Sequence, residues 1–273
     1  MIIKLTQCKS AHEPLQLVHL TDSHLMSDES KTFAGISPIA SLNAVLTHLQ
    51  AHYRLDDIDG LINTGDIAQD SIVSTYQHYL SALAPLNKPH FWIRGNHDDL
   101  KDFPKPDAKD APIVIVADKW CIILLNSQAD DCIYGVLQPE HLQKLQEYLI
   151  QYQDHHVLIA FHHHTFPVGS AWLDQHILQN SKGFLDCIAP YPNVKLVLSG
   201  HVHQQFEHKH HGVTFLSSPS SFVQFKPKSH DFSLDDLHGG YRMLYLYPNG
   251  EFKTQIHYLT ESIGTIDKSI TQY

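Results

Sequence analysis

Apolar residues along this chain gather in short runs, and each run is followed by a cluster of polar residues. The clearest runs cover residues 17–20, 60–62, 90–93, 157–161 and 195–198. Short apolar runs bounded by polar clusters are typical of strands that are buried on both faces of a sheet. The pattern therefore predicts buried strands over these segments.

Helical spacing occupies the stretches between the runs. Pro38 follows a candidate N-cap, Ser37, and the apolar residues after it recur every three or four positions. The same spacing recurs over residues 73–83 and, after Pro139, over residues 142–152. Because strands and helices alternate along the chain, the pattern predicts an α/β fold.

The chain changes character after Gly212. Residues 213–216, 241–247 and 252–258 are expected to be strands, with no clear helix between them. Pro248-Asn249-Gly250 is expected to join the last two strands as a hairpin, since tight β-turns favour residues that tolerate a positive φ.

Residues 217–240 form a long, irregular stretch that is rich in Ser, Pro and Lys. In a compact domain such a stretch is typical of a functional loop. Neither an internal repeat nor a domain boundary is visible in the sequence. We therefore expect a single domain over residues 1–273, completed by the C-terminal loop and hairpin at about residues 217–260.

Charge and hydropathy exclude several classes of protein. Lys and Arg number 19 against 29 Asp and Glu, for a formal charge of -10, so we expect no nucleic-acid partner. The longest apolar runs, residues 113–117 and 121–125, are far shorter than the roughly 18 residues of a membrane span, so we expect no membrane partner. Residues 1–16 lack the apolar core of a secretory signal, which predicts a cytoplasmic location. The sequence predicts no particular oligomeric state.

The cysteines agree with that location. Cys8, Cys121, Cys132 and Cys187 stand far apart and form no Cys-X-X-Cys pair. We expect buried, reduced thiols rather than a disulfide or zinc framework.

Histidine is the unusual feature of the composition, because its 23 residues outnumber Lys and Arg together. Histidine is the side chain most used for metal binding and proton transfer near neutral pH. Candidate ligands follow the predicted strands, and because ligands collect at the carboxyl ends of strands in α/β sheets, they could converge on one site. These candidates are Asp22, His24, Asp66, Asn96, His97, His162, His201 and His203.

The donor atoms of this set are oxygen and imidazole nitrogen, without sulfur, which suits manganese, iron or zinc. Seven candidate metal ligands are too many for one ion and suit two, with Asp66 as the bridge between them. The seven are Asp22, His24, Asp66, Asn96, His162, His201 and His203. Two cations that share a hydroxide are suited to hydrolysing phosphoesters. Gly65, Gly95 and Gly200 each precede a candidate ligand, where the lack of a side chain would allow a sharp turn and close approach.

Each cluster taken alone has an ordinary structural explanation. Asp22 could cap a turn, Asn96 could be a turn residue, and the run 162–164 could reflect the histidine-rich composition. These separate explanations do not account for the fact that all the clusters follow predicted strands. Other histidines lack that context and are expected at the surface, namely His52, His155, His156, His208, His210 and His211.

The motifs at these strand ends resemble those of the calcineurin-like metallophosphoesterases. They are Thr21-Asp22-Ser23-His24, Thr64-Gly65-Asp66, Gly95-Asn96-His97-Asp98, His162-His163-His164 and Gly200-His201-Val202-His203. Within that family the chain is similar to bacterial class III cyclic-nucleotide phosphodiesterases. The narrower resemblance depends on residues 169–176, Gly-Ser-Ala-Trp-Leu-Asp-Gln-His, and on residues 223–227, Val-Gln-Phe-Lys-Pro.

The resemblance implies a four-layer αββα sandwich, in which two mixed β-sheets are flanked by helices. It implies one metal held by Asp22, His24, Asp66 and His203, and another held by Asp66, Asn96, His162 and His201. It also places the phosphate among His24, Asp66, Asn96, His97, His162 and His203. The implied cofactors are two divalent transition-metal ions, Fe²⁺ or Mn²⁺ with Zn²⁺ as an alternative, and the implied substrate is a small cyclic nucleotide.

These expectations combine into a reaction. A metal-bridging hydroxide would attack the phosphorus of 3′,5′-cyclic AMP, and the 3′ oxygen would leave to give 5′-AMP. His97, directly after ligand Asn96, is the candidate general acid, with Asp98 or Asp70 as its orienting carboxylate. The alternatives are hydrolysis of 2′,3′-cyclic nucleotides, phosphomonoesters or pyrophosphates, or a non-catalytic metal-binding protein.

Aromatic residues near the candidate ligands offer a surface for a purine. Trp172, Phe222 and Phe225 could stack on a base, and Lys226 could add a positive charge. Each aromatic residue could equally belong to the hydrophobic core.

Overall fold

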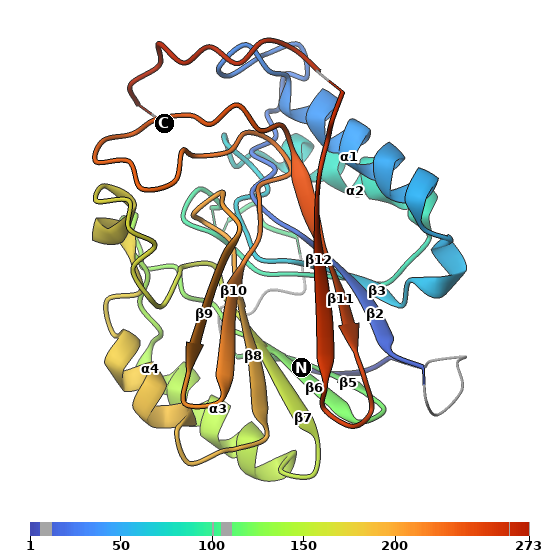
Figure 1. Cartoon of the computed structure of the whole chain (residues 1–273), viewed down its shortest axis with the longest axis vertical. Helices are drawn as coiled ribbons and strands as arrows, with labels where there is room; N and C mark the ends of the chain where they lie inside the picture. The colour runs from blue at the N-terminus through green and yellow to red at the C-terminus, as the bar shows by residue number, and fades with distance from the viewer. Residues whose placement is uncertain (6–12, 100, 105–110, 262, 273) are drawn as a thin grey trace.

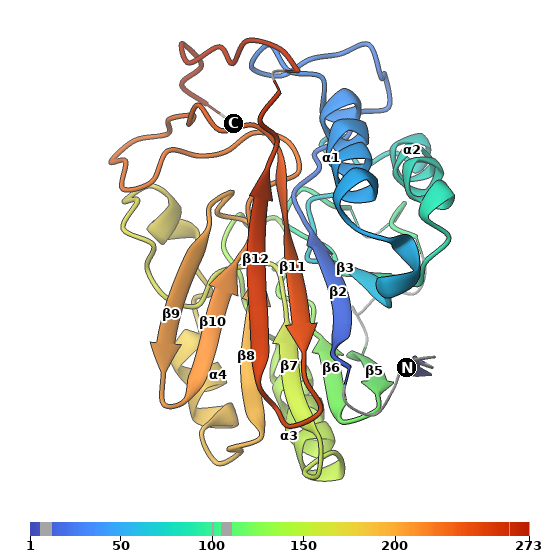
Figure 2. The same cartoon turned by 45° about the vertical axis from the view of Figure 1, so that its right-hand side comes forward.

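Two β-sheets lie face to face at the centre of the molecule, and helices cover their outer faces (Figures 1 and 2). The structure is a computed structural model that describes residues 1–5, 13–99, 101–104, 111–261 and 263–272. The described chain contains no helix long and apolar enough to cross a membrane.

The larger sheet is mixed and has seven strands. Its order is β1 (Ile2–Lys4), β5 (Ile113–Ala117), β6 (Trp120–Leu124), β7 (His156–Ala160), β8 (Val194–Ser199), β10 (Val213–Ser217) and β9 (Phe206–His210). The β6-β7-β8-β10 stretch is parallel, whereas β5 runs antiparallel to β6 and β9 runs antiparallel to β10.

The smaller sheet has five strands and is also mixed. Its order is β12 (Phe252–Tyr258), β11 (Gly240–Leu246), β2 (Leu15–Leu20), β3 (Gly60–Asn63) and β4 (His90–Trp92). Strands β2, β3 and β4 are parallel, and the β11–β12 hairpin extends the sheet beside β2 in antiparallel pairing. The predicted C-terminal hairpin is confirmed, and Gly250 supplies the positive φ of its turn, at 86°.

Two helices cover each sheet. The five-stranded sheet packs against α1 (Pro38–His52) and α2 (Val73–Leu83), and the seven-stranded sheet packs against α3 (Pro139–Gln151) and α4 (Ser181–Ile188). Short 3₁₀ turns cover η1 (Leu55–Asp57), η2 (Ala84–Leu86) and η3 (Leu173–His176). As predicted, Ser37 is the N-cap of α1 and accepts a hydrogen bond from the backbone N–H of Ala40 at 3.3 Å.

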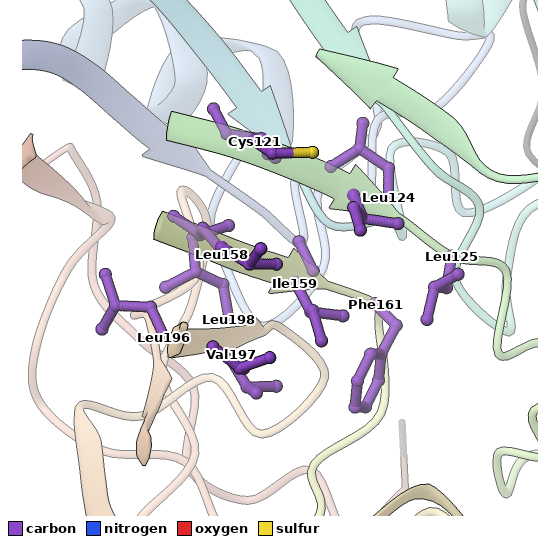
Figure 3. Packing of buried hydrophobic residues seen from close by; sticks show 14 of the residues in the cluster. Cys121, Leu124, Leu125, Leu158, Ile159, Phe161, Leu196, Val197 and Leu198 are labelled. Carbon is purple, nitrogen blue, oxygen red and sulfur yellow. The ribbon is translucent and has the colours of Figure 1, made fainter. Parts of the chain in front are cut away.

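The inner faces of the two sheets share one hydrophobic cluster. Leu17 and Leu244 of the smaller sheet belong to the same cluster as Ile122 and Ile159 of the larger sheet, and all four are fully buried. Figure 3 shows side chains of β6, β7 and β8 within this cluster. The predicted α/β class and four-layer sandwich are therefore confirmed.

The apolar runs at residues 113–117 and 121–125 lie in β5 and β6, whereas β1, α4, β9 and the 3₁₀ turns lie where the sequence pattern predicted no element. β9 alternates half-buried and exposed positions, but its residues are mostly charged or histidine. His208 and His210, which were expected at the surface, are half-buried there against Phe166, with ring centroids 4.0 and 5.2 Å from the Phe166 ring. An edge strand tolerates such side chains because only one of its sides is paired.

The cysteines agree in part with the prediction. Cys121 and Cys187 are buried, Cys132 is half-buried, and all three are free thiols. Cys8 lies outside the described residues.

Candidate active site

The predicted ligands gather at the carboxyl ends of strands from both sheets. Asp22 and His24 follow β2, Asp66 follows β3 and Asn96 follows β4. The seven-stranded sheet contributes three more, which are His162 after β7 and then His201 and His203 after β8. All except the half-buried Asn96 are buried. The site therefore exists only where the two sheets meet.

One group of these side chains forms around His24 and His203. Their Nε2 atoms lie 3.2 Å apart, His203 Nε2 is 3.4 Å from Asp22 Oδ1, and His24 Nε2 is 3.7 Å from Asp66 Oδ2. The ligand atoms of Asp22, His24 and His203 lie close enough together to hold one cation, and Asp66 Oδ2 lies next to them through His24.

A second group forms around His162 Nε2. Its neighbours are Asn96 Oδ1 at 3.0 Å, Asp66 Oδ2 at 3.2 Å and His201 Nδ1 at 3.2 Å. Asp66 Oδ2 thus faces both groups, while its Oδ1 accepts a hydrogen bond from the backbone N–H of His97 at 2.9 Å. This is the geometry expected of a carboxylate that bridges two cations.

Hydrogen bonds on the far side of the imidazoles decide which nitrogen is available to a metal. His24 Nδ1 lies 2.7 Å from Gln69 Oε1, and His203 Nδ1 lies 2.8 Å from the Val223 carbonyl. His162 Nδ1 lies 2.8 Å from the Thr64 carbonyl. Because these oxygens accept, each Nδ1 carries a proton, and each Nε2 is the nitrogen that faces the other candidate ligands.

Lone pairs that face one another repel unless a cation or a proton lies between them. The Nε2 atoms of His24 and His203 are in this position, and His162 Nε2 faces two oxygens and a nitrogen in the same way. The donor set therefore fits two cations.

Electrostatics in the site support the same conclusion. Burial alone would raise the pKa of Asp66, but the surrounding histidines, His162 foremost, hold it well below its ordinary value. Burial would lower the pKa of His162, but the Asp66 carboxylate outweighs it and raises the pKa to about 9. Burial lowers the pKa of His24 to about 3 and that of His201 well below its ordinary value. The site therefore attracts positive charge while keeping two of its imidazoles neutral.

The backbone turns sharply at the ligands. Asp22, His24, Asp66, His201 and His203 all have positive φ, between 43° and 66°. This conformation is uncommon for residues other than glycine and is often found where function requires it.

The predicted need for glycine beside the ligands is borne out by close approach. A Cβ on Gly200 would lie 2.6 Å from Asp22 Oδ2 and closer still to Thr21 Oγ1. Gly65 has a φ of +109° and packs against Gly95, and a Cβ on Gly95 would lie 2.6 Å from the Asp66 nitrogen. The glycines thus let neighbouring ligand loops touch one another.

Of the three consecutive histidines, His162 lies next to Asp66, and His163 also comes within metal-ligand distance of His162 and His201. His163 lies 2.9 Å from the Ile133 carbonyl through Nε2 and 2.8 Å from Ser127 Oγ through Nδ1, so both of its nitrogens are engaged elsewhere. His164 Nε2 lies 3.6 Å from Asp174 Oδ1. The geometry favours His162 as the ligand of the three.

Comparison with known proteins identifies the family. The sequence model of the calcineurin-like phosphoesterase family matches residues 15–205. The 3′,5′-cyclic adenosine monophosphate phosphodiesterase CpdA of Vibrio vulnificus is 37% identical over 249 residues, which cover 90% of each chain. The chain belongs to the calcineurin-like phosphoesterase family.

A second relative and a solved structure are also similar to this chain. A 3′,5′-cyclic-nucleotide phosphodiesterase of Nostoc sp. is 36% identical over 266 residues, covering 94% of this chain and 97% of the relative. A dimetal phosphatase from Danio rerio has the same fold, with a TM-score of 0.63 at 12% identity over 89% of this chain and 98% of that chain. Calcineurin-like phosphoesterases use a dinuclear metal centre, which the two groups around Asp66 fit.

His97 lies beside the predicted metal ligands, and one of its ring nitrogens comes within metal-ligand distance of His24 and Asp66. It is half-buried, and its ring lies edge-on to that of His24 with centroids 4.9 Å apart. Asp98 accepts hydrogen bonds from the backbone N–H groups of Ile67, Ala68 and Gly95 and from the Tyr76 hydroxyl. Asp98 therefore clamps the loops after β3 and β4 together. Burial, and then the nearby Asp66, raise its pKa to about 7.

The hydrogen bonds of the Asp70 carboxylate also go to neighbouring loop and helix residues. It accepts hydrogen bonds from the Ser27 backbone N–H, the Ser27 hydroxyl and the Thr75 hydroxyl. Asp70 and Asp98 therefore hold loops around the site, and the choice between them as the carboxylate that orients His97 stays a prediction.

A cavity of about 420 Å³ opens beside the two groups. Its polar wall includes Asp66, Asn96, His97, His201 and His203, and its other lining residues are mostly aromatic or apolar. Leu173 and His176 belong to residues 169–176, the segment that carries the narrower resemblance. Sequence reasoning missed three of the lining residues, which are Ile133, Phe232 and Gln272. They come from loops far apart in the chain, and no local pattern marks them.

The candidate base-binding residues fall in different places. Trp172 is half-buried and lines the cavity, with its ring 5.0 Å from that of Phe225. Phe225 also lines the cavity but is buried, and it stacks on the His203 ring at 4.0 Å and 6°. Phe222 is buried in a hydrophobic cluster, and Lys226 is exposed. Neither is among the residues that line the cavity.

Proposed function

We propose that the protein hydrolyses 3′,5′-cyclic AMP to 5′-AMP at this site. The observation that carries the proposal is the pair of ligand groups sharing Asp66 Oδ2 at the floor of a cavity large enough for a nucleotide. The choice of substrate comes from the names of the relatives, which include CpdA cyclic AMP phosphodiesterases at 32% to 37% identity over most of the chain.

The proposed metal ligands follow the two groups. Asp22, His24, Asp66 and His203 would hold one ion, and Asp66, Asn96, His162 and His201 would hold the other. Nitrogen and carboxylate donors without sulfur support Fe²⁺ or Mn²⁺, with Zn²⁺ as an alternative. When bound, two such ions supply a nucleophilic hydroxide near neutral pH and withdraw charge from the phosphate.

The side chains around the ions would position the ester. Asn96 and His97 line the cavity next to Asp66, so their polar atoms are placed to contact phosphate oxygens. His24, His162 and His203 would complete the surroundings of the phosphate. His97 is the proposed general acid, because an alkoxide leaves readily only when a proton reaches it.

The cavity's aromatic wall supports a nucleotide over a simple phosphate. Trp172 offers an aromatic face at the cavity, and base stacking on such faces is worth about 1 to 3 kcal/mol. We propose a small cyclic nucleotide as the partner and a single domain as the folding unit. Neither a nucleic acid nor a membrane is part of the proposal, and the cytoplasm stays a prediction.

A substrate panel tests the proposed reaction. Metal-loaded protein would be compared on 3′,5′-cyclic AMP, 3′,5′-cyclic GMP, 2′,3′-cyclic AMP and an aryl phosphate. We expect the highest kcat/KM on 3′,5′-cyclic AMP, with 5′-AMP as product. A clear preference for 2′,3′-cyclic AMP or the aryl phosphate would replace the proposal with another reaction of the same family.

A further inference from the structure

A chain of buried hydrogen bonds runs behind the candidate metal centre, from the C-terminal hairpin to the ends of β2 and β3. Arg242 Nε donates to Ser218 Oγ at 3.1 Å, and Ser218 Oγ lies 2.6 Å from His19 Nδ1. His19 Nε2 lies 2.9 Å from Thr64 Oγ1, which lies 2.7 Å from Thr21 Oγ1. All five residues are buried.

The charges at its two ends give this series of hydrogen bonds a direction. Arg242 can only donate, so the Ser218 hydroxyl oxygen accepts from it and is polarised to donate its own proton to His19 Nδ1. His19 then carries its proton on Nε2 and donates to Thr64, which donates to Thr21. The negative charge of the nearby Asp22 favours the same alignment, because the donors then point away from the Arg242 cation.

Arg242 is well fixed for this role. Its Nη1 donates to Thr254 Oγ1 at 2.8 Å, and its Nη2 donates to the Ser217 carbonyl at 2.7 Å. Burial lowers its pKa only to about 10, so it stays charged at neutral pH. Burial, and then the charge of Arg242, lower the pKa of His19 to about 3, so His19 stays neutral.

The far end of the chain supports the proposed ligands. The carbonyl of Thr64 accepts the hydrogen bond that orients His162. The hydroxyls of Thr64 and Thr21 form the surface on which Gly200 packs, directly before His201. The backbone N–H of His201 in turn donates to the Asp22 carboxylate at 3.0 Å. A shift of Thr64 would therefore displace His162 and His201 together.

We propose that Arg242, Ser218 and His19 are positioning residues that fix Thr64, and through it the imidazoles of His162 and His201, for metal binding. The proposal rests on the ligand assignment made under the proposed function. Arg242 and Ser218 lie beyond residues 15–205, so a segment outside the part matched by the family description would tune the metal centre.

The proton position on His19 tests the direction of the chain without any metal or turnover. In ¹⁵N-labelled, metal-free protein, we expect the ring of His19 to show the shifts of the neutral Nε2–H tautomer between about pH 6 and 8. The His19→Gln variant would assign the signal. An Nδ1–H tautomer or a charged ring would overturn the proposal while leaving the proposed reaction intact.

Substitution of His19 tests the consequence for metal binding. Glutamine can accept from Ser218 through its oxygen and donate to Thr64 through its nitrogen, whereas leucine can do neither. In competition with a chelator, we expect His19→Leu to weaken Mn²⁺ binding roughly 10- to 100-fold. The Mn²⁺ affinity of His19→Gln should stay within a few-fold of that of the wild type.

Two further variants separate positioning from general packing. His141 is another buried histidine, whose Nδ1 lies 3.2 Å from the Asn126 carbonyl, so His141→Leu should lower Tm without a comparable loss of Mn²⁺ affinity. Ser218→Ala breaks the same series of hydrogen bonds with a smaller change and should also weaken Mn²⁺ binding. It therefore tests the proposal even if His19→Leu does not fold. Unchanged Mn²⁺ affinity in Ser218→Ala, or equal losses in His19→Gln and His19→Leu, would overturn the proposal.

Discussion

His97 lines the cavity with Asp66 and Asn96 and is not in the proposed ligand set, so in the proposed reaction it would donate a proton to the departing oxygen. We predict that His97→Ala keeps both metals but loses turnover on cyclic AMP by roughly 10²- to 10⁴-fold. Metal analysis and kcat, measured on the same preparation, check this outcome.

A better leaving group distinguishes proton donation from phosphate positioning. An activated aryl phosphodiester needs no general acid, so His97→Ala should be far less impaired on that substrate. Equal losses on both substrates would assign His97 to holding the phosphate.

Trp172 and Phe225 differ in burial, and this difference separates their predicted effects. Trp172→Ala should lower kcat/KM on cyclic AMP roughly 10- to 100-fold while sparing an aryl phosphodiester that has no base. Phe225→Ala removes a buried ring that stacks on His203, so it should cost about 3 to 5 kcal/mol of stability and weaken metal binding.

The two variants are compared by kcat/KM on both substrates and by Tm. A base-specific loss in Phe225→Ala with unchanged Tm would contradict the separation, as would an equal loss on both substrates in Trp172→Ala.

At this scale the sequence predicted which residues come together, because ligand types at strand ends carry their own signal. It could not predict that Phe225 stacks on His203 and lines the cavity while Phe222 does neither, since both are aromatic residues of one irregular loop and both belong to the same hydrophobic cluster. Only the path of residues 217–240 through space distinguishes them.

Among the elements, the turn after β8 depends most closely on a single residue. A Cβ on Gly200 would collide with Thr21 Oγ1 and Asp22 Oδ2, so we predict that Gly200→Ala loses about 1 to 3 kcal/mol of stability and binds metal poorly. Gly183 in α4 has open space around it, and Gly183→Ala should instead gain up to about 1 kcal/mol. Chemical denaturation of both variants measures the contrast, and a neutral Gly200→Ala would contradict it.

Helix α1 meets β11 and β12 through a cluster of histidine and tyrosine residues. The rings of His48 and His52 stack at 3.9 Å, His48 Nδ1 lies 3.1 Å from the Tyr241 hydroxyl, and Tyr53 bonds to His257 Nε2 at 2.6 Å. Burial first, and then the neighbouring histidines, lower the pKa values of His48 and His257 below their ordinary 6.5.

The sign of the resulting pH dependence follows from these lowered values. A histidine whose pKa is lower in the folded state binds protons more readily when unfolded, so its contribution to stability is present above pH 6.5 and is lost as the pH falls. We predict that the loss of stability between about pH 7.5 and about pH 5.5 is smaller in His257→Gln than in the wild type. An unchanged loss by urea denaturation would contradict this.

The strand and helix predictions succeeded where the pattern of apolar residues was regular. The end of β2, and the start and buried face of α1, follow directly from such patterns. By contrast, β9 has an alternating pattern of burial but charged and histidine side chains, so its hydrophobic signal is absent. Pairing with β10, a tertiary contact, is what defines β9.

At the scale of the whole molecule, the site depends on how the two sheets face each other. Asp66 comes from the five-stranded sheet and His162 from the seven-stranded sheet, yet their ligand atoms lie 3.2 Å apart. Ligand identity could be predicted from the sequence because it is local. The depth of the cavity, and the contribution of Gln272 to its wall, arise only when distant loops pack together.

The central claim, a cyclic AMP hydrolase that needs two metals, is tested most directly by one titration. Metal-free protein would be titrated with Mn²⁺, and 5′-AMP formation from 3′,5′-cyclic AMP would be recorded by ³¹P NMR at each ratio, with Asp66→Ala as the control. We predict that the rate reaches its maximum at two ions per chain and that Asp66→Ala, lacking the bridge, stays inactive. A maximum at one ion per chain, or no 5′-AMP at any ratio, would contradict the claim.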